Sequence, residues 1–166
     1  DVEWVLDRVK ARSPRRFVDY GCGNGALLTA VAATGVEAIG FDIDPAGVEQ
    51  AARASGCPVF VFGDAGSRWG TAEMLHLGDV LEHVSDPVSV LEDACRLMQP
   101  GGVILAQGPL EANRSLFNLI LGLAAIAAGR RPVDTPPYHV HLVSARGQQR
   151  FFSRCDLTEE SFDTHD

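Results

Sequence analysis

The segment Asp19-Tyr20-Gly21-Cys22-Gly23-Asn24-Gly25 places a glycine at every second position, directly after the apolar pair Phe17-Val18. An apolar-periodic stretch, residues 26–33, follows it. This order predicts a strand, a glycine turn and a helix. Glycine lets the backbone turn tightly and lie against a ligand, because no Cβ stands in the way. A turn of this kind alone is a weak signal, since any Rossmann-like nucleotide-binding domain can contain one.

A second apolar run, residues 37–41, ends in a pair of acids, Asp42 and Asp44, ahead of Pro45. Nucleotide-binding folds place an acid on the ribose hydroxyls about 20 residues after the turn. An ionised carboxylate can accept from both hydroxyls of such a diol. Asp before Pro is also a typical helix start. We assign Asp44 to the helix cap and Asp42 to the ribose.

A third acid, Asp64, follows the β-branched and aromatic run of residues 59–62. At the end of a third strand its carboxylate can meet an adenine amino group. A plain turn aspartate explains this residue nearly as well.

Taken together, five segments in this order resemble the class I S-adenosylmethionine (SAM)-dependent methyltransferases. They are Asp19 to Gly25, Gly40 to Asp44, Gly63 to Ala65, Leu77 to Pro87 and Leu97 to Gly102. The resemblance extends from residue 17 to about 108. The competing interpretation is an NAD-dependent oxidoreductase, whose motif is Gly-x-Gly-x-x-Gly. Here the third glycine stands one place early, which disfavours that interpretation.

The resemblance implies a cofactor site for SAM. Asp19 and the turn would bracket its methionine moiety, Asp42 its ribose, and Asp64 with Ala65 its adenine. The full set of cofactor-binding residues expected from the resemblance is Asp19, Gly21, Cys22, Gly23, Gly25, Asp42, Ile43, Asp64, Ala65 and Gly78.

Methyl transfer from a sulfonium needs alignment in a dry pocket more than metal or covalent help. If the acceptor is a hydroxyl, a base must take its proton, and histidine suits that task near neutral pH. His83 follows the fourth expected strand, and His139 lies in a Pro-rich stretch, residues 136–144, that resembles one in small-molecule and sugar methyltransferases. Each also has a structural interpretation. His83 can line the wall of the cofactor pocket without moving a proton, and His139 can make a purely structural hydrogen bond in a loop. His76 is expected to be a satisfied core histidine.

A metal-dependent alternative rests on Asp79, Glu82 and His83 with His139 or His141, which resembles the metal site of small-RNA 2′-O-methyltransferases. A net charge of −8 disfavours an RNA substrate, because nucleic-acid binders usually carry a basic face. We therefore expect a small-molecule acceptor, no nucleic acid and no bound metal. A non-catalytic SAM-binding module is a third interpretation.

The 166 residues are expected to form a single domain, residues 1–166, with 46% hydrophobic and 22% charged residues. The four cysteines are scattered without metal-ligand spacing, which favours reduced thiols in a cytoplasmic protein. Residues 110–145 are expected to be a helical insertion or lid over the acceptor site. Within it the apolar stretch 115–129 is too short to cross a bilayer and predicts a buried helix, a lid or a homodimer contact.

The fold class expected is α/β, a doubly wound Rossmann-like, mostly parallel sheet with helices on both faces. The expected strands are 16–20, 37–42, 58–62, 73–78 and 102–107, and the expected helices are 2–12, 25–34, 45–55, 86–98 and 114–128. Residues 158–163 are expected to form a sixth strand. We also expect the last strand of the family's sheet to be missing from this chain.

Overall fold

The computed structural model describes residues 2–62, 71–109 and 144–163. Predictions made for Asp64, Ala65, His139, His141 and the apolar stretch 115–129 lie outside these residues. The chain divides into two compact units, which are described in turn. One is Asp1–Val80 with Asp93–Gln107, and the other is Leu81–Glu92 with Gly108–Asp166.

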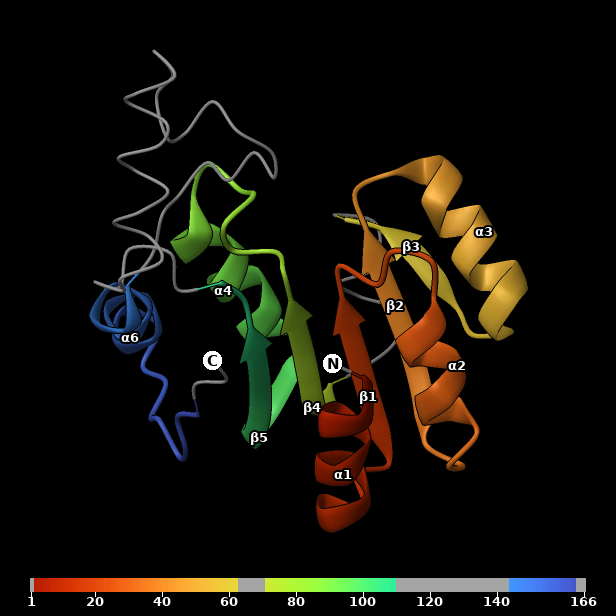
Figure 1. Ribbon diagram of the computed structural model, residues 1–166, viewed down its shortest axis with the longest axis horizontal. Helices are drawn as coiled ribbons and strands as arrows, with labels where there is room; N and C mark the ends of the chain where they lie inside the picture. Colours follow the sequence, from red (N-terminus) through yellow and green to blue (C-terminus); the bar gives the residue numbers. More distant parts are fainter. Residues whose placement is uncertain (1, 63–70, 110–143, 164–166) are drawn as a thin grey trace, which may run out of the picture. The chain divides into compact units, whose positions relative to one another are not determined.

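The first unit is built on a parallel five-stranded sheet with the order β3-β2-β1-β4-β5 (Figure 1). Its strands are β1 (Arg16–Tyr20), β2 (Glu37–Asp42), β3 (Val59–Val61), β4 (Ala72–Gly78) and β5 (Met98–Gln107). The order reverses between β1 and β4, and α/β proteins bind ligands beyond the carboxyl ends of the strands at such a switch point. The predicted α/β fold class and all five predicted strand positions are confirmed.

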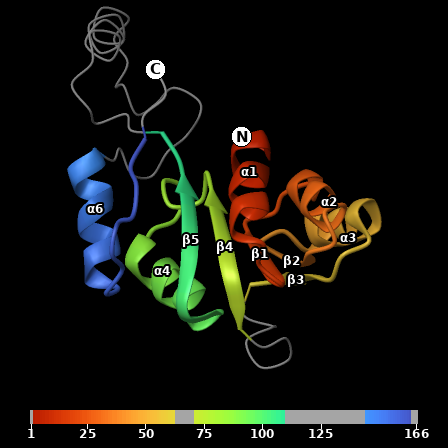
Figure 2. The same cartoon turned by 90° about the horizontal axis from the view of Figure 1, so that it is seen from below.

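Three helices, α1 (Val2–Arg12), α2 (Ala26–Ala32) and α3 (Pro45–Ser55), lie on one face of the sheet (Figure 2). Their apolar side chains pack with sheet residues of that face, among them Phe17 and Met74. The opposite face is buried as well, since Ile39 and Leu75 are 0% exposed. Burial of both faces is the property expected of a doubly wound sheet.

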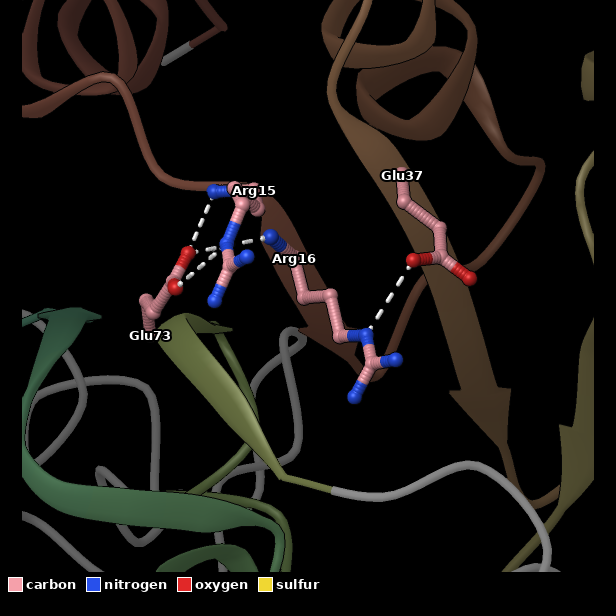
Figure 3. Close-up of polar contacts among 4 residues, drawn as sticks. All are labelled: Arg15, Arg16, Glu37 and Glu73. Carbon is pink, nitrogen blue, oxygen red and sulfur yellow. Dashed lines mark hydrogen bonds and ion pairs between the residues drawn. The ribbon is translucent and has the colours of Figure 1, made fainter.

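The amino-terminal edge of the sheet is fastened by two acid–arginine contacts (Figure 3). The Glu73 carboxylate accepts from the backbone N–H groups of Arg15 and Arg16 and pairs with the Arg15 side chain at 3.4 Å. Arg16 pairs with Glu37 of β2 at 3.1 Å. The backbone N–H of Arg15 is the main cause that holds the pKa of Glu73 below its ordinary value. These contacts join the start of β1 to both neighbouring strands, away from the carboxyl edge.

The Pro100-Gly101-Gly102 segment lies inside β5, although the sequence predicts it between a helix at 86–98 and a strand at 102–107. Helix α4 (Pro87–Arg96) stops before it, and β5 already begins at Met98. The pairing between β4 and β5 shifts register at this point, and Gly101 has a φ of 79°. A Pro-Gly-Gly sequence, which often separates two elements, here marks an irregularity within one strand. Glycine permits the positive φ that such an irregularity needs.

In the second unit, Asp86 caps the start of α4, because its Oδ1 accepts from the N–H groups of Val88 and Ser89. Helix α6 (Ala145–Arg154), which the sequence analysis did not predict, is capped by Ser144. Residues 158–163 form no strand, so that prediction is wrong. The adjacent Glu159 and Glu160 would place a carboxylate on each face of a strand, which a buried sheet disfavours.

Candidate functional site

The last residues of the strands bring the predicted cofactor residues of the first unit to one edge of the sheet. Tyr20, next to Asp19, pairs with Phe41 of β2 and with Leu77 of β4. Asp19 and Asp42 therefore lie at the same carboxyl edge, as the sequence predicts, and Gly78 ends β4 there.

The glycine turn adopts the left-handed backbone that its alternating glycines predict. Gly21, Gly23 and Gly25 have φ angles of 92°, 51° and 78°. A side chain would be strained at each of them. A Cβ at Gly21 would lie 2.4 Å from Cγ2 of Val80, whereas a Cβ at Gly23 would meet no described atom within 4 Å. The turn is closely packed at its start and open at its middle, which suits a ligand lying against its backbone.

Asp42, the last residue of β2, holds this turn through hydrogen bonds. Its Oδ2 accepts from the N–H of Gly23 at 2.8 Å, and its Oδ1 accepts from the N–H groups of Ile43 and Asp44 at 2.7 and 3.2 Å. The N–H groups of Gly21 and Cys22 donate to the carbonyl of Phe41 nearby. This role could not be predicted from the sequence, because the contact depends on how β1 and β2 pair. A carboxylate has about four acceptor positions, so Asp42 retains capacity for a further donor.

Two neighbours of Asp42 have distinct surroundings. Ile43 is 75% exposed, although it is a large apolar side chain. Asp44 caps α3 by accepting from the N–H groups of Ala46 and Gly47, both at 3.1 Å. The prediction that Asp44 caps this helix is confirmed.

Cys22 is buried inside the turn and is unsuited to nucleophilic chemistry. Burial first, and then the nearby carboxylates of Asp19 and Asp42, raises its pKa to about 12. Its sulfur lies against Gly40, where a Cβ would come within 2.8 Å of it. The side chain fills the space between the turn and Gly40 of β2.

Near the carboxyl ends of β1, β4 and β5, three polar side chains contact one another in a chain. His76 Nδ1 lies 2.9 Å from Oδ1 of Asp19, and His76 Nε2 lies 3.1 Å from Oε1 of Gln107. Asp19 and His76 are 2% and 9% exposed. The prediction that His76 is a satisfied histidine is confirmed. Its partner Asp19, however, was expected only to face the cofactor.

The residues after β4 begin with an unusual backbone. Asp79 has a φ of 51°, and its N–H donates to the carbonyl of Gln107 at 3.0 Å. Farther along, in the second unit, Glu82 is buried and His83 is exposed in the turn that precedes α4. Within residues 2–62, 71–109 and 144–163, no three His, Cys, Asp or Glu side chains gather as metal ligands.

A family model described as a methyltransferase domain matches residues 3–158. Among curated relatives, the ubiquinone biosynthesis O-methyltransferase of Methylococcus capsulatus is 36% identical over 117 residues, which cover 66% of this chain and 48% of that protein. The enzyme of the same name from Paracidovorax citrulli is 30% identical over 144 residues, covering 81% and 60%. The chain thus spans about half the length of the curated relatives it matches.

Solved structures show the same fold at low identity. Magnesium protoporphyrin IX methyltransferase from Synechocystis, with bound SAH, aligns with a TM-score of 0.67 at 16% identity over 93% of this chain and 70% of that one. A methyltransferase-like protein from Bacillus halodurans aligns with a TM-score of 0.70 at 14% identity over 93% and 68%. With its parallel five-stranded sheet and its family match over residues 3–158, this chain belongs to the class I SAM-dependent methyltransferases.

Proposed function

We propose that this protein transfers a methyl group from SAM to the hydroxyl oxygen of a small molecule. The observation that carries the proposal is the glycine turn, held in left-handed conformation at the switch point and fastened to Asp42. The O-methyltransferase names of the curated relatives support oxygen as the acceptor atom.

The residues at the carboxyl edge suit each part of the cofactor. Asp19 and the backbone of Gly21 to Gly25 would hold the methionine moiety, and the remaining acceptor capacity of Asp42 would take ribose hydroxyls. The exposed side chain of Ile43 would give an apolar surface to the adenine ring. Ala65, Asp64 and Gly78 complete the proposed set, the first two outside the described residues.

When bound, SAM supplies an activated methyl carbon on a sulfonium. The chain has to hold the acceptor oxygen in line with that carbon and exclude water. We propose His83 or His139 as the base that takes the hydroxyl proton while the new O–C bond forms and the S–C bond breaks. The products are the methyl ether, S-adenosylhomocysteine and a protonated histidine, which returns its proton to solvent.

The proposal extends to surroundings and partners. We propose a cytoplasmic enzyme, supported by four cysteines that are all free thiols. In the described part of the chain, no helix combines the length and apolar character needed to cross a bilayer. We propose residues 110–145 as a lid over the acceptor and the stretch 115–129 as a homodimer contact, with no nucleic-acid partner. Light scattering of the purified protein tests the dimer.

The activity test is methyl transfer from methyl-labelled SAM to a panel of phenols, sugars and carboxylic acids. We expect transfer to at least one hydroxyl acceptor, unchanged by a metal chelator. His83→Ala and His139→Ala are compared with the matched control His165→Ala. A base is identified by a fall in kcat of about 10²–10⁴-fold with little change in KM. Loss of activity on chelation would favour a metal-assisted reaction instead.

A further inference from the structure

Three polar side chains on adjacent strands form one buried chain at the carboxyl edge of the first unit. Asp19 of β1 pairs directly with His76 of β4, and Gln107 ends β5 two residues beyond the partner of His76. The Nδ1–Oδ1 contact is 2.9 Å and the Nε2–Oε1 contact is 3.1 Å. The chain lies on the same face of the sheet as the apolar core residues Phe17 and Met74.

The chemistry of the three groups fixes the orientation of the imidazole. A carboxylate can only accept, so Nδ1 of His76 carries the proton that it shares with Asp19. Nε2 faces Oε1 of Gln107 and donates to it when the ring is charged. When the ring is neutral, the Gln107 amide turns over so that its N–H donates to Nε2. In both states the ring is held at both ends.

The sequence provides the room for this ring at Gly78. A Cβ at Gly78 would lie 2.4 Å from Cε1 and 2.9 Å from Nε2 of His76. Contacts of that length are forbidden, so His76 can reach Gln107 only because residue 78 has no side chain. The position expected to contact the cofactor thus also accommodates the ring that holds Asp19.

The contact with His76 occupies one oxygen of Asp19. Its other oxygen, Oδ2, accepts from none of the residues that the structure describes. Burying a carboxylate is costly unless it is paired, and His76 supplies a partner for Oδ1. The arrangement fixes the direction in which Oδ2 points.

We propose that His76 is a positioning residue that holds the Asp19 carboxylate in place for the ammonium group of the cofactor's methionine moiety. This inference rests on the proposed function, because it assigns Asp19 to that moiety. Its rival is a structural role, in which the polar chain only joins β1, β4 and β5.

The test compares two amide variants of similar size. In His76→Asn the side-chain nitrogen can take the place of Nδ1 and still donate to Asp19. In His76→Gln it takes the place of Nε2 and cannot. Calorimetry measures the affinity of each for S-adenosylhomocysteine and for 5′-methylthioadenosine, which lacks the amino-acid portion. We expect His76→Asn to stay within about threefold of the unaltered protein and His76→Gln to lose about tenfold, with the 5′-methylthioadenosine affinity unchanged in both.

A double-mutant cycle with Asp19→Asn gives a second readout on the same protein. If His76 acts through Asp19, then His76→Gln costs little further affinity once Asp19 is neutral. Additive losses would overturn the inference, as would equal losses for both probes or equal affinities of the two amide variants. If the unaltered protein binds neither probe, the proposed function itself fails. Binding of the probes without the Asn–Gln difference overturns the inference alone.

Discussion

Asp42 serves the site in two ways, and each has a separate measurable consequence. Its carboxylate holds the middle of the glycine turn through Gly23 and is proposed to accept from the ribose. The side chain of Asp44, two residues later, bonds only the start of α3 among the described residues. The pair therefore offers a site residue and a matched structural control.

Asp42→Ala should weaken S-adenosylhomocysteine binding by roughly 1.5–3 kcal/mol, the usual worth of hydrogen bonds to a charged group. Asp44→Ala should lower the free energy of unfolding by about 1 kcal/mol through loss of the cap, with affinity unchanged. Calorimetry and thermal unfolding separate the two effects. Unchanged affinity in Asp42→Ala would show that the ribose is held elsewhere.

Gly78→Ala should disturb the site through His76, because the added methyl would stand 2.4 Å from Cε1 of the imidazole. We expect weaker S-adenosylhomocysteine binding and a lower melting temperature. Asparagine has no atoms at the Cε1 and Nε2 positions, so Gly78→Ala should be better tolerated in a His76→Asn background. An equal cost in both backgrounds would mean that the methyl clashes with something other than the ring.

Cys22 should resist thiol reagents until the protein unfolds. At pH 8, a rise in pKa from 9.0 to about 12 lowers the thiolate fraction about a thousandfold. Mass spectrometry of labelled peptides, native against denatured, measures this protection. Fast native labelling at Cys22 would show that its thiol is accessible in the folded protein.

The same raised pKa predicts alkaline sensitivity. A group whose pKa is higher when folded contributes stability that is complete below pH 9 and is lost as pH rises toward 12. Tyr20, whose pKa is also raised to about 12 by burial and then by Asp93, acts in the same direction. The free energy of unfolding should fall by about 1.4 kcal/mol per pH unit for each group, from pH 9.0 for Cys22 and from pH 10.0 for Tyr20. Cys22→Ala should have a shallower slope.

At the scale of elements, the carboxyl edge of the sheet is proposed to bind the cofactor, whereas the amino edge contributes to stability. The carboxyl edge has the glycine turn, whereas at the amino edge Glu73 and its arginine partners join β4 to the start of β1 (Figure 3). Substitutions at the amino edge should therefore change stability without changing binding.

Glu73→Gln should destabilise the protein at neutral pH and leave S-adenosylhomocysteine affinity unchanged. The pKa of Glu73 is lowered on folding, so its contribution is present above 4.5 and disappears as pH falls through the lowered value. The difference in melting temperature between Glu73→Gln and the unaltered protein should shrink with acidification. If the difference in melting temperature persists in acid, the loss of stability comes from the changed shape of the side chain and not from its lost charge.

The elements that the sequence predicted well are those whose signals are local. Alternating glycines predicted the turn, and Asp44-Pro45 predicted the start of α3. Features that depend on strand pairing could not be predicted in this way. The contacts of His76 with Asp19 and Gln107 need the strand order β1-β4-β5, and the Gly23–Asp42 bond needs β2 beside β1. No local pattern in the sequence contains this order.

The wrong predictions also have local causes. Pro100-Gly101-Gly102 has the composition of a break but lies in an irregular part of β5. The prediction of a strand at residues 158–163 rests on the family's sheet alone, since these residues show no alternation of apolar and polar side chains. Helix α6 has few apolar residues apart from Phe151 and Phe152, so its period is hard to see in the sequence.

At the scale of the whole molecule, the strand order and its switch point are typical of a nucleotide-type cofactor site, and the family match over residues 3–158 indicates that the cofactor is SAM. A dinucleotide site would use the same edge of the sheet, so the fold alone does not separate the two. The difference depends on how the glycine turn and Asp42 fit an adenosyl sulfonium.

The most direct measurement is calorimetric titration of the 166-residue chain with S-adenosylhomocysteine and, separately, with NAD. The account predicts saturable one-to-one binding of S-adenosylhomocysteine, weakened in Asp42→Ala and unchanged in Asp44→Ala, and no binding of NAD at the same concentrations. Binding of NAD without S-adenosylhomocysteine would contradict it.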